Sequence, residues 1–123
     1  MTKVLAVDDD PVIQRLLQVN LEMEGYEVEV ASDGDEALVK ARTTRPDAIL
    51  LDVMMPKKDG WQVCAELKAD PDLQAIPVVF LSARAQDADI QKGTDLGVAA
   101  YITKPFDPID LVELVDELTG RSR

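Results

Sequence analysis

Aspartates that directly follow apolar stretches are the strongest candidates for reactive residues in this chain. Asp8, Asp9 and Asp10 follow the apolar stretch that ends at Val7, and Asp52 follows the run Ala48–Leu51. Carboxylates brought together repel one another, and each pair about 4 Å apart costs about 4 kcal/mol at the effective dielectric near a protein surface. Either one acid keeps its proton through a raised pKa, or a divalent cation binds between them.

The absence of histidine limits what such a cation could be. The chain contains no histidine and one cysteine, Cys64, which lies in a helical pattern and is expected to fill the core. Histidine-based catalysis, Ser-His or Cys-His nucleophiles and histidine metal sites are therefore excluded. With oxygen ligands and few backbone carbonyls at hand, we expect Mg²⁺ with several retained waters, for which Mn²⁺ can substitute.

Two further polar residues end apolar runs, Ser82 and Lys104. Lys104 supplies a positive charge suited to a phosphoryl oxygen, and Ser82 supplies a hydroxyl donor. Asp52, taken as ionised at pH 7 with an ordinary pKa, needs no base to act as a nucleophile. These parts predict in-line attack by Asp52 on a phosphoryl group, which yields an acyl phosphate.

Alternating strand and helix patterns would bring these residues together. The predicted strands are Lys3–Val7, Tyr26–Ala31, Ala48–Asp52, Pro77–Ser82 and Val98–Thr103. The predicted helices run from Pro11 to Glu24, from Asp33 to Arg45, from Gly60 to Asp70, from Ala85 to Leu96, and from Pro108 past Leu118. This alternation predicts one α/β domain over residues 1–123, a doubly wound, flavodoxin-like parallel sheet of five strands in the order 2-1-3-4-5 with five helices. The carboxyl ends of parallel strands meet at one edge, so the four polar positions should converge there.

Several neighbouring residues have simpler interpretations. Asp10 is expected to cap a helix rather than bind metal, and Asp59 is expected to be a turn residue. Lys57 and Lys58 are expected to be solvated loop charges, with contact to a partner's acids as the alternative. Trp61 is expected to be partly buried packing.

The charge balance and the termini restrict partners and location. With 24 acids and 13 bases the net charge is −11, which argues against direct binding to nucleic acid. No run approaches the roughly 18 apolar residues of a membrane span, and the N-terminus has no signal-peptide pattern, so we expect a cytoplasmic protein without membrane contact.

Five motifs, in order and in register, closely resemble the receiver domain of response regulators (CheY-like), the phosphorylated modules of two-component and phosphorelay signalling. They are Val7-Asp8-Asp9-Asp10, Leu51-Asp52-Val53-Met54-Met55-Pro56, Asp59-Gly60, Leu81-Ser82-Ala83 and Tyr101-Ile102-Thr103-Lys104-Pro105-Phe106. The resemblance covers the whole chain.

The resemblance implies roles at the acidic cluster. Asp52 would be the phospho-acceptor, supplied from a phosphohistidine on a sensor histidine kinase or a histidine phosphotransfer protein. Asp9 would bind Mg²⁺ directly, Asp8 through a water molecule, and Met54 through its backbone carbonyl.

The resemblance also implies a switch. Ser82 would move toward the phosphoryl group and Tyr101 would turn inward, which would reshape the face formed by the fourth helix, the fifth strand and the fifth helix. From the residues alone, Tyr101 could equally be core packing. Met54 and Ala83 match positions that flank the attacking water and set the phosphoryl lifetime, and the Lys104-Pro105 peptide bond is expected to be cis.

The predicted function is a phosphorylation-dependent signalling switch, not an enzyme in the ordinary sense, although it supports its own Mg²⁺-dependent phosphotransfer and slow dephosphorylation. A downstream effector protein, or an output domain beyond Arg123, would respond to it. One alternative is a receiver that no longer takes phosphate and acts only as a docking module. A phosphatase of the haloacid-dehalogenase type would need a second acid where Met54 stands, and a flavodoxin-like electron carrier would need a Ser/Thr-rich loop where Asp8–Asp10 stand.

Overall fold

The computed structural model describes residues 2–83 and 86–120 and contains five strands and five helices in strict alternation. The strands are β1 (Lys3–Val7), β2 (Glu27–Ala31), β3 (Ala48–Asp52), β4 (Val78–Ser82) and β5 (Ala100–Thr103). The helices are α1 (Pro11–Met23), α2 (Gly34–Thr44), α3 (Gly60–Ala69), α4 (Asp87–Asp95) and α5 (Pro108–Thr119). All neighbouring strands are parallel, in the order β2-β1-β3-β4-β5, which confirms the predicted fold.

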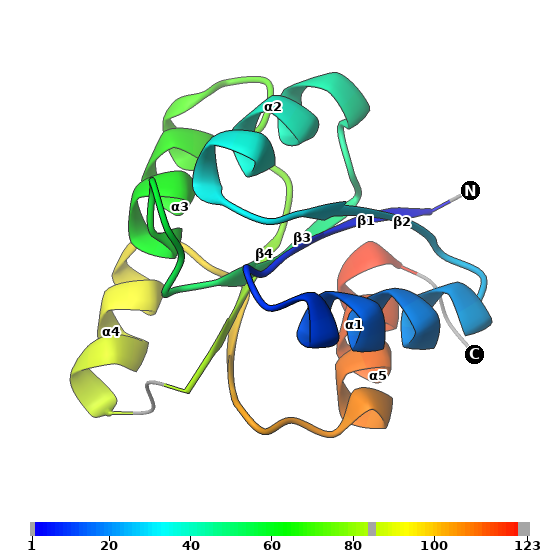
Figure 1. Cartoon of the computed structure of the whole chain (residues 1–123). Helices are drawn as coiled ribbons and strands as arrows, with labels where there is room; N and C mark the ends of the chain where they lie inside the picture. Colours follow the sequence, from blue (N-terminus) through cyan, green and yellow to red (C-terminus); the bar gives the residue numbers. More distant parts are fainter. Residues whose placement is uncertain (1, 84–85, 121–123) are drawn as a thin grey trace.

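Helices cover both faces of the sheet. Figure 1 shows α1 and α5 side by side on one face, with α2 and α3 on the other and α4 next to α3. Successive residues of the inner strands point to alternate faces, so Leu5 and Val7 join the core under α2 and α3, whereas Val4 and Ala6 join the core under α1 and α5. Strands buried on both faces need the uninterrupted apolar sequence that β3 shows.

Aspartates begin four of the helices. Asp10 accepts a hydrogen bond from the Val12 N–H, with Pro11 in the first turn, so its prediction as a cap is confirmed. Asp107 caps α5 in the same way, and Asp33 caps α2 by accepting from the Glu36 N–H. Asp59, predicted to be a turn residue, is the N-cap of α3, in a reciprocal capping box with Gln62.

The boundaries around α4 and β5 differ from the predictions. The helix was predicted to begin at Ala85, which lies outside the described residues, and the structure begins α4 at Asp87. Strand β5 begins at Ala100 rather than Val98, because the Val98 N–H still bonds to the Gly93 carbonyl at the end of α4. Within the described parts of the chain, no helix combines the length and the apolar composition needed to cross a membrane.

Candidate functional site

The carboxyl ends of four strands meet at one edge of the sheet, as predicted. Asp8 directly follows β1, Asp52 ends β3, Ser82 ends β4 and Lys104 follows β5. The register pairs Asp52 with Leu81 and Ser82 with Thr103, so these ends lie level with one another. The topology therefore gathers the predicted residues from four separate parts of the chain.

Three carboxylates form the centre of the site. Asp8, Asp9 and Asp52 each offer one carboxylate oxygen, and these oxygens lie within 4.8 Å of one another. Asp8 is fully buried and Asp52 is 6% exposed, whereas Asp9 is exposed. An all-oxygen donor set with one solvent-facing member fits a hard divalent cation that keeps some of its waters.

Lys104 partly balances this negative charge. Its Nζ lies 2.7 Å from Asp8 Oδ2 and 3.6 Å from Asp52 Oδ2. The Lys104-Pro105 peptide bond is cis, as expected, and the Lys104 N–H donates to the Ser82 carbonyl at 2.8 Å. Burial disfavours the charged ammonium, but the hydrogen bond to Asp8 and the charges of Asp52 and Asp8 outweigh burial, and the pKa of Lys104 is raised.

The pKa of Asp52 is not the ordinary value that the sequence suggested. Burial is the largest cause and the neighbouring charge of Asp8 the next, and together they raise the pKa of Asp52 to about 6, against the opposing effects of Lys104 and the Met54 N–H. The carboxylate is still largely ionised at pH 7, so it can act as a nucleophile. Its ionised form is, however, costly unless more positive charge is present.

The loop after β3 is held close to the site by a glycine. The Gly60 N–H donates to the Val53 carbonyl at 2.7 Å, and a Cβ on Gly60 would lie 2.5 Å from the Asp52 carbonyl oxygen. Met54, predicted to offer its carbonyl to the metal, is 55% exposed, and its N–H donates to Asp52 Oδ1 at 3.4 Å. These contacts with Asp52 and Val53 fix the position of the loop that connects β3 to α3 beside the acidic cluster.

The two loop lysines, Lys57 and Lys58, form ion pairs within the chain that the sequence did not indicate. Lys57 Nζ lies 3.5 Å from Asp33, and Lys58 Nζ lies 2.8 Å from Glu66, so both predicted solvated charges contact acids of this chain. A Cβ on Gly34 would lie 2.3 Å from the Lys58 carbonyl oxygen, so the loop also rests on the start of α2. No local sequence signal reveals these contacts, because they join segments that only the fold makes neighbours.

The predicted switch residues differ in their surroundings. Ser82 is 1% exposed at the end of β4, and Ala83 beside it is exposed. Tyr101 is half-buried, with its ring centroid 6.0 Å from that of Phe80 and 6.5 Å from that of Trp61. Trp61 is therefore a packing residue, as predicted, and Tyr101 lies in the same aromatic group.

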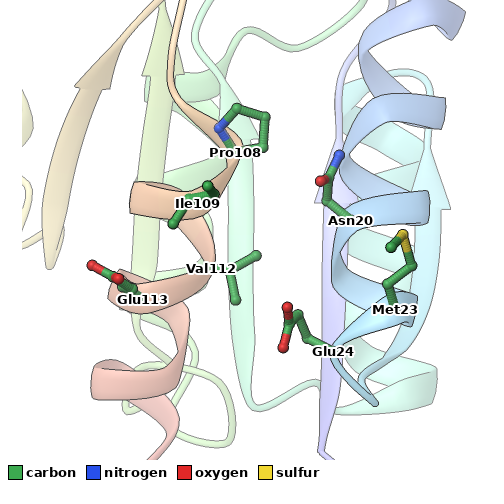
Figure 2. Close-up of a pocket in the computed structure, with 7 residues that line it drawn as sticks. All are labelled: Asn20, Met23, Glu24, Pro108, Ile109, Val112 and Glu113. Atoms are coloured by element: carbon green, nitrogen blue, oxygen red, sulfur yellow. The ribbon is translucent and has the colours of Figure 1, made fainter. Parts of the chain in front are cut away.

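A small pocket lies elsewhere, between α1 and α5. Figure 2 shows Asn20 and Met23 from α1 on one side of it and Ile109 and Val112 from α5 on the other. Its volume is about 70 Å³, and it contains none of the predicted site residues.

The comparison with protein families decides among the interpretations of this site. Residues 4–116 match the family described as the response regulator receiver domain. The chain belongs to this family. Membership in it decides against the phosphatase and the electron carrier that the sequence left as alternatives.

The receiver is similar to part of known transcriptional regulators. It is 46% identical over 120 residues to the alkaline phosphatase synthesis transcriptional regulatory protein PhoP of Bacillus subtilis, a match that covers 98% of this chain and 49% of that protein. It is 43% identical over 122 residues to the DNA-binding dual master transcriptional regulator RpaA of Synechocystis, covering 99% of this chain and 51% of that protein. The chain thus spans about half the length of these curated relatives.

Solved structures show the same architecture. The receiver domain of the Francisella response regulator 1452 superposes with a TM-score of 0.92 at 34% identity, covering 100% of both chains. The Vibrio cholerae chemotaxis protein CheY4 superposes with a TM-score of 0.90 at 35% identity, covering 96% of the receiver and 98% of that chain.

Proposed function

We propose that this receiver is a phosphorylation-dependent switch in which Asp52 accepts a phosphoryl group. The observation that carries the proposal is the buried Asp52 carboxylate, which has the carboxylates of Asp8 and Asp9 within 4.8 Å and the Lys104 ammonium at 3.6 Å. A nucleophile beside an acidic metal site and a fixed cation is the arrangement that phosphoryl transfer requires.

The acidic cluster fits Mg²⁺, with Mn²⁺ as a substitute. Asp9 would bind it directly, Asp8 through a water molecule, and Asp52 and the Met54 carbonyl would complete the protein ligands. The buried Asp8 carboxylate, which already accepts from Lys104 and from the Asp10 N–H, supports the indirect role, and the exposure of Asp9 supports the direct one. The ion would supply positive charge to the phosphoryl oxygens.

The residues of this chain would carry out the transfer itself. A carboxylate oxygen of Asp52 forms the new O–P bond as the N–P bond of a phosphohistidine breaks, and the imidazole leaves with the electron pair and takes up a proton. Lys104 neutralises a phosphoryl oxygen, and the Ser82 hydroxyl donates to another. Hydrolysis of the acyl phosphate by water resets the switch, at a rate set in part by Met54 and Ala83, the exposed residues beside the site.

Movement of Ser82 and Tyr101 would carry the change outward. Ser82 ends β4, and Tyr101 lies in β5 with its ring next to Gly93 of α4. The proposed output surface is therefore the face formed by α4, β5 and α5, the strand that carries Tyr101 and the helices that precede and follow it in the chain. The receiver acts as a signalling module, and its own phosphotransfer and slow dephosphorylation are its only proposed reactions.

The proposed donor is a sensor histidine kinase or a histidine phosphotransfer protein. Such a protein must contact the edge where α1 begins, directly after Asp8–Asp10. There α1 exposes Val12 at 72%, with Leu16 and Val19 each more than a third exposed. Contiguous exposed apolar side chains are typical of protein contact surfaces.

We further propose that residues 1–123 form one receiver domain in the cytoplasm that acts on an effector protein or an attached output domain. The names of PhoP and RpaA describe transcriptional regulators, which supports an output domain of that kind. The net charge of −11 argues against direct contact of this domain with nucleic acid or with a membrane, because both are negatively charged. No observation favours the phosphorylation-independent docking module.

The decisive experiment is incubation with Mg²⁺ and acetyl phosphate, followed by intact-protein mass spectrometry. We expect a gain of one phosphoryl group that is absent in Asp52→Asn and in the presence of EDTA. The matched control is Asp72→Asn, which removes an exposed acid that is not part of the acidic cluster. This variant should be labelled like the unsubstituted protein. Labelling that persists in Asp52→Asn would overturn the assignment.

A further inference from the structure

Helix α4 lacks the apolar stripe that holds the other helices to the sheet. Within Asp87–Asp95, all of which the structure describes, the buried residues are Asp89 and Gly93, and the largest apolar side chain, Ile90, is 37% exposed. By contrast α5 buries Leu111, Val112 and Val115. Since packing of an apolar face supplies most of the stability of a helix in a protein, α4 must be held in another way.

The backbone of α4 rests directly on two aromatic rings. A Cβ on Gly93 would lie 3.2 Å from ring atoms of both Phe80 and Tyr101, so the absence of a side chain lets the helix approach them closely. Phe80 belongs to β4 and lies two residues before Ser82, and Tyr101 belongs to β5.

The neighbouring Lys92 links α4 to α3. Its Nζ lies 4.5 Å from the centroid of the Trp61 ring, within the range of a cation–π interaction, for which tryptophan is the best acceptor. The Trp61 ring in turn meets Phe80 edge-on, with centroids 5.0 Å apart, and is tilted against Tyr101 at 6.5 Å. One tryptophan therefore contacts the cation that holds α4 and the tyrosine that is proposed to switch.

We propose that Lys92 and Trp61 are positioning residues that hold α4 in its unphosphorylated position, and that phosphorylation of Asp52 weakens their contact. This inference rests on the proposed function. If Tyr101 turns when Asp52 is phosphorylated, Trp61 loses one of its supporting rings and α4 loses part of the surface under Gly93. Coupling between two sites is reciprocal, so weakening the Lys92–Trp61 contact favours the phosphorylated arrangement by the same factor.

The first test measures the anchoring of α4 by hydrogen exchange in the unphosphorylated chain without Mg²⁺. An exposed cation–π contact corresponds to about a two- to five-fold change in an equilibrium constant. Lys92→Gln is expected to speed exchange of the α4 amides by about that factor, and Lys92→Arg, which keeps a cation over the ring, to restore slow exchange. Arg15→Gln on α1 loses the same charge and should leave α4 unchanged. Equal exchange in Lys92→Gln and the unsubstituted chain would overturn the proposal.

The second test measures the coupling, with beryllofluoride and Mg²⁺ as a probe that mimics the phosphoryl group on Asp52. In an NMR titration that follows the amides of Val53 and Met54, Lys92→Gln should be half-saturated at about two- to five-fold less beryllofluoride, and Lys92→Arg should not. Unchanged half-saturation in Lys92→Gln would show that the contact is merely structural and would overturn the coupling.

The two tests separate this inference from the proposed function. If beryllofluoride gives the same response in Asp52→Asn as in the unsubstituted chain, the proposed function fails and the coupling fails with it. The exchange measurement needs neither metal nor phosphate, so it still decides whether Lys92 holds α4.

Discussion

At the scale of single residues, the chemistry of the site depends on a carboxylate that is costly to ionise. Burial and the charge of Asp8 raise the pKa of Asp52 from 3.8 to about 6, and Lys104 offsets only part of that effect. The folded chain therefore holds a proton on Asp52 more tightly than the unfolded chain does. The stability that this proton contributes is present at low pH and is lost as pH rises through about 6.

This linkage predicts how Asp52→Asn behaves in EDTA. The unsubstituted chain becomes less stable as Asp52 ionises, whereas the variant has no charge at this position. The free energy of unfolding of Asp52→Asn, relative to that of the unsubstituted chain, should therefore increase by about 1 to 2 kcal/mol between pH 5 and pH 8. Urea unfolding at the two pH values measures it, with Asp72→Asn as a control whose difference should stay flat. A constant advantage for Asp52→Asn would show that the pKa of Asp52 is ordinary.

Cys64 illustrates the opposite case, a residue whose chemistry is suppressed. It is fully buried in the core under α2 and α3, and burial raises the pKa of its thiol. We expect its reaction with a thiol reagent at pH 8 to be slow in the native chain and fast in urea, because a buried neutral thiol is neither accessible nor nucleophilic. Fast labelling without denaturant would mean that α3 opens readily from the sheet.

At the scale of elements, two glycines show how closely the helices approach the parts they support. A Cβ on Gly60 would meet backbone atoms of Asp52 and Val53 at 2.5 and 2.8 Å, whereas a Cβ on Gly93 would meet ring atoms at 3.2 Å. Backbone cannot move aside without moving the site, whereas rings can shift by a few tenths of an ångström.

We therefore expect Gly60→Ala and Gly93→Ala to differ in cost. Gly60→Ala should lower the free energy of unfolding by about 1 to 3 kcal/mol, the usual cost of overpacking. In Gly93→Ala the better helix propensity of alanine, about 1 kcal/mol, offsets a milder clash, so its stability should stay within about 1 kcal/mol of the unsubstituted chain. Chemical denaturation ranks the two, and the reverse order would show that α3 adjusts more easily than α4.

At the scale of the whole molecule, the acidic cluster adds to a general excess of negative charge. The net charge is −11, so any salt relieves some repulsion, and a specific metal site must be distinguished from screening.

Mg²⁺ at about ten times its dissociation constant should stabilise the fold by about 1.4 kcal/mol, which raises Tm by several degrees. NaCl of equal ionic strength should stabilise the fold less than Mg²⁺ does. In Asp9→Asn most of this difference between the two salts should disappear, because Asp9 is the solvent-facing acid of the cluster. Differential scanning calorimetry measures both effects. Equal stabilisation by the two salts would contradict a specific site.

The class and the order of the elements could be predicted from local sequence patterns alone. Strand β3 reads as buried on both faces because four apolar residues run without a break, and helices α1 and α5 are marked by an aspartate and a proline at their starts. Such signals are local, and they were enough to place Asp8, Asp52, Ser82 and Lys104 at one edge of a parallel sheet. The end of α4 and the start of β5 were less predictable, because they depend on a hydrogen bond from the Val98 N–H to the Gly93 carbonyl.

The energies and contacts within the site could not be predicted in this way, because they depend on which segments the fold brings together. The raised pKa of Asp52 depends on burial and on the distance to Asp8, neither of which a strand pattern contains. The pairing of Lys57 with Asp33, and the position of Lys92 over Trp61, join residues far apart in the sequence. Electrostatic and aromatic contacts act through space and fall off within a few ångströms, so they become definite only when the fold has fixed which segments are neighbours.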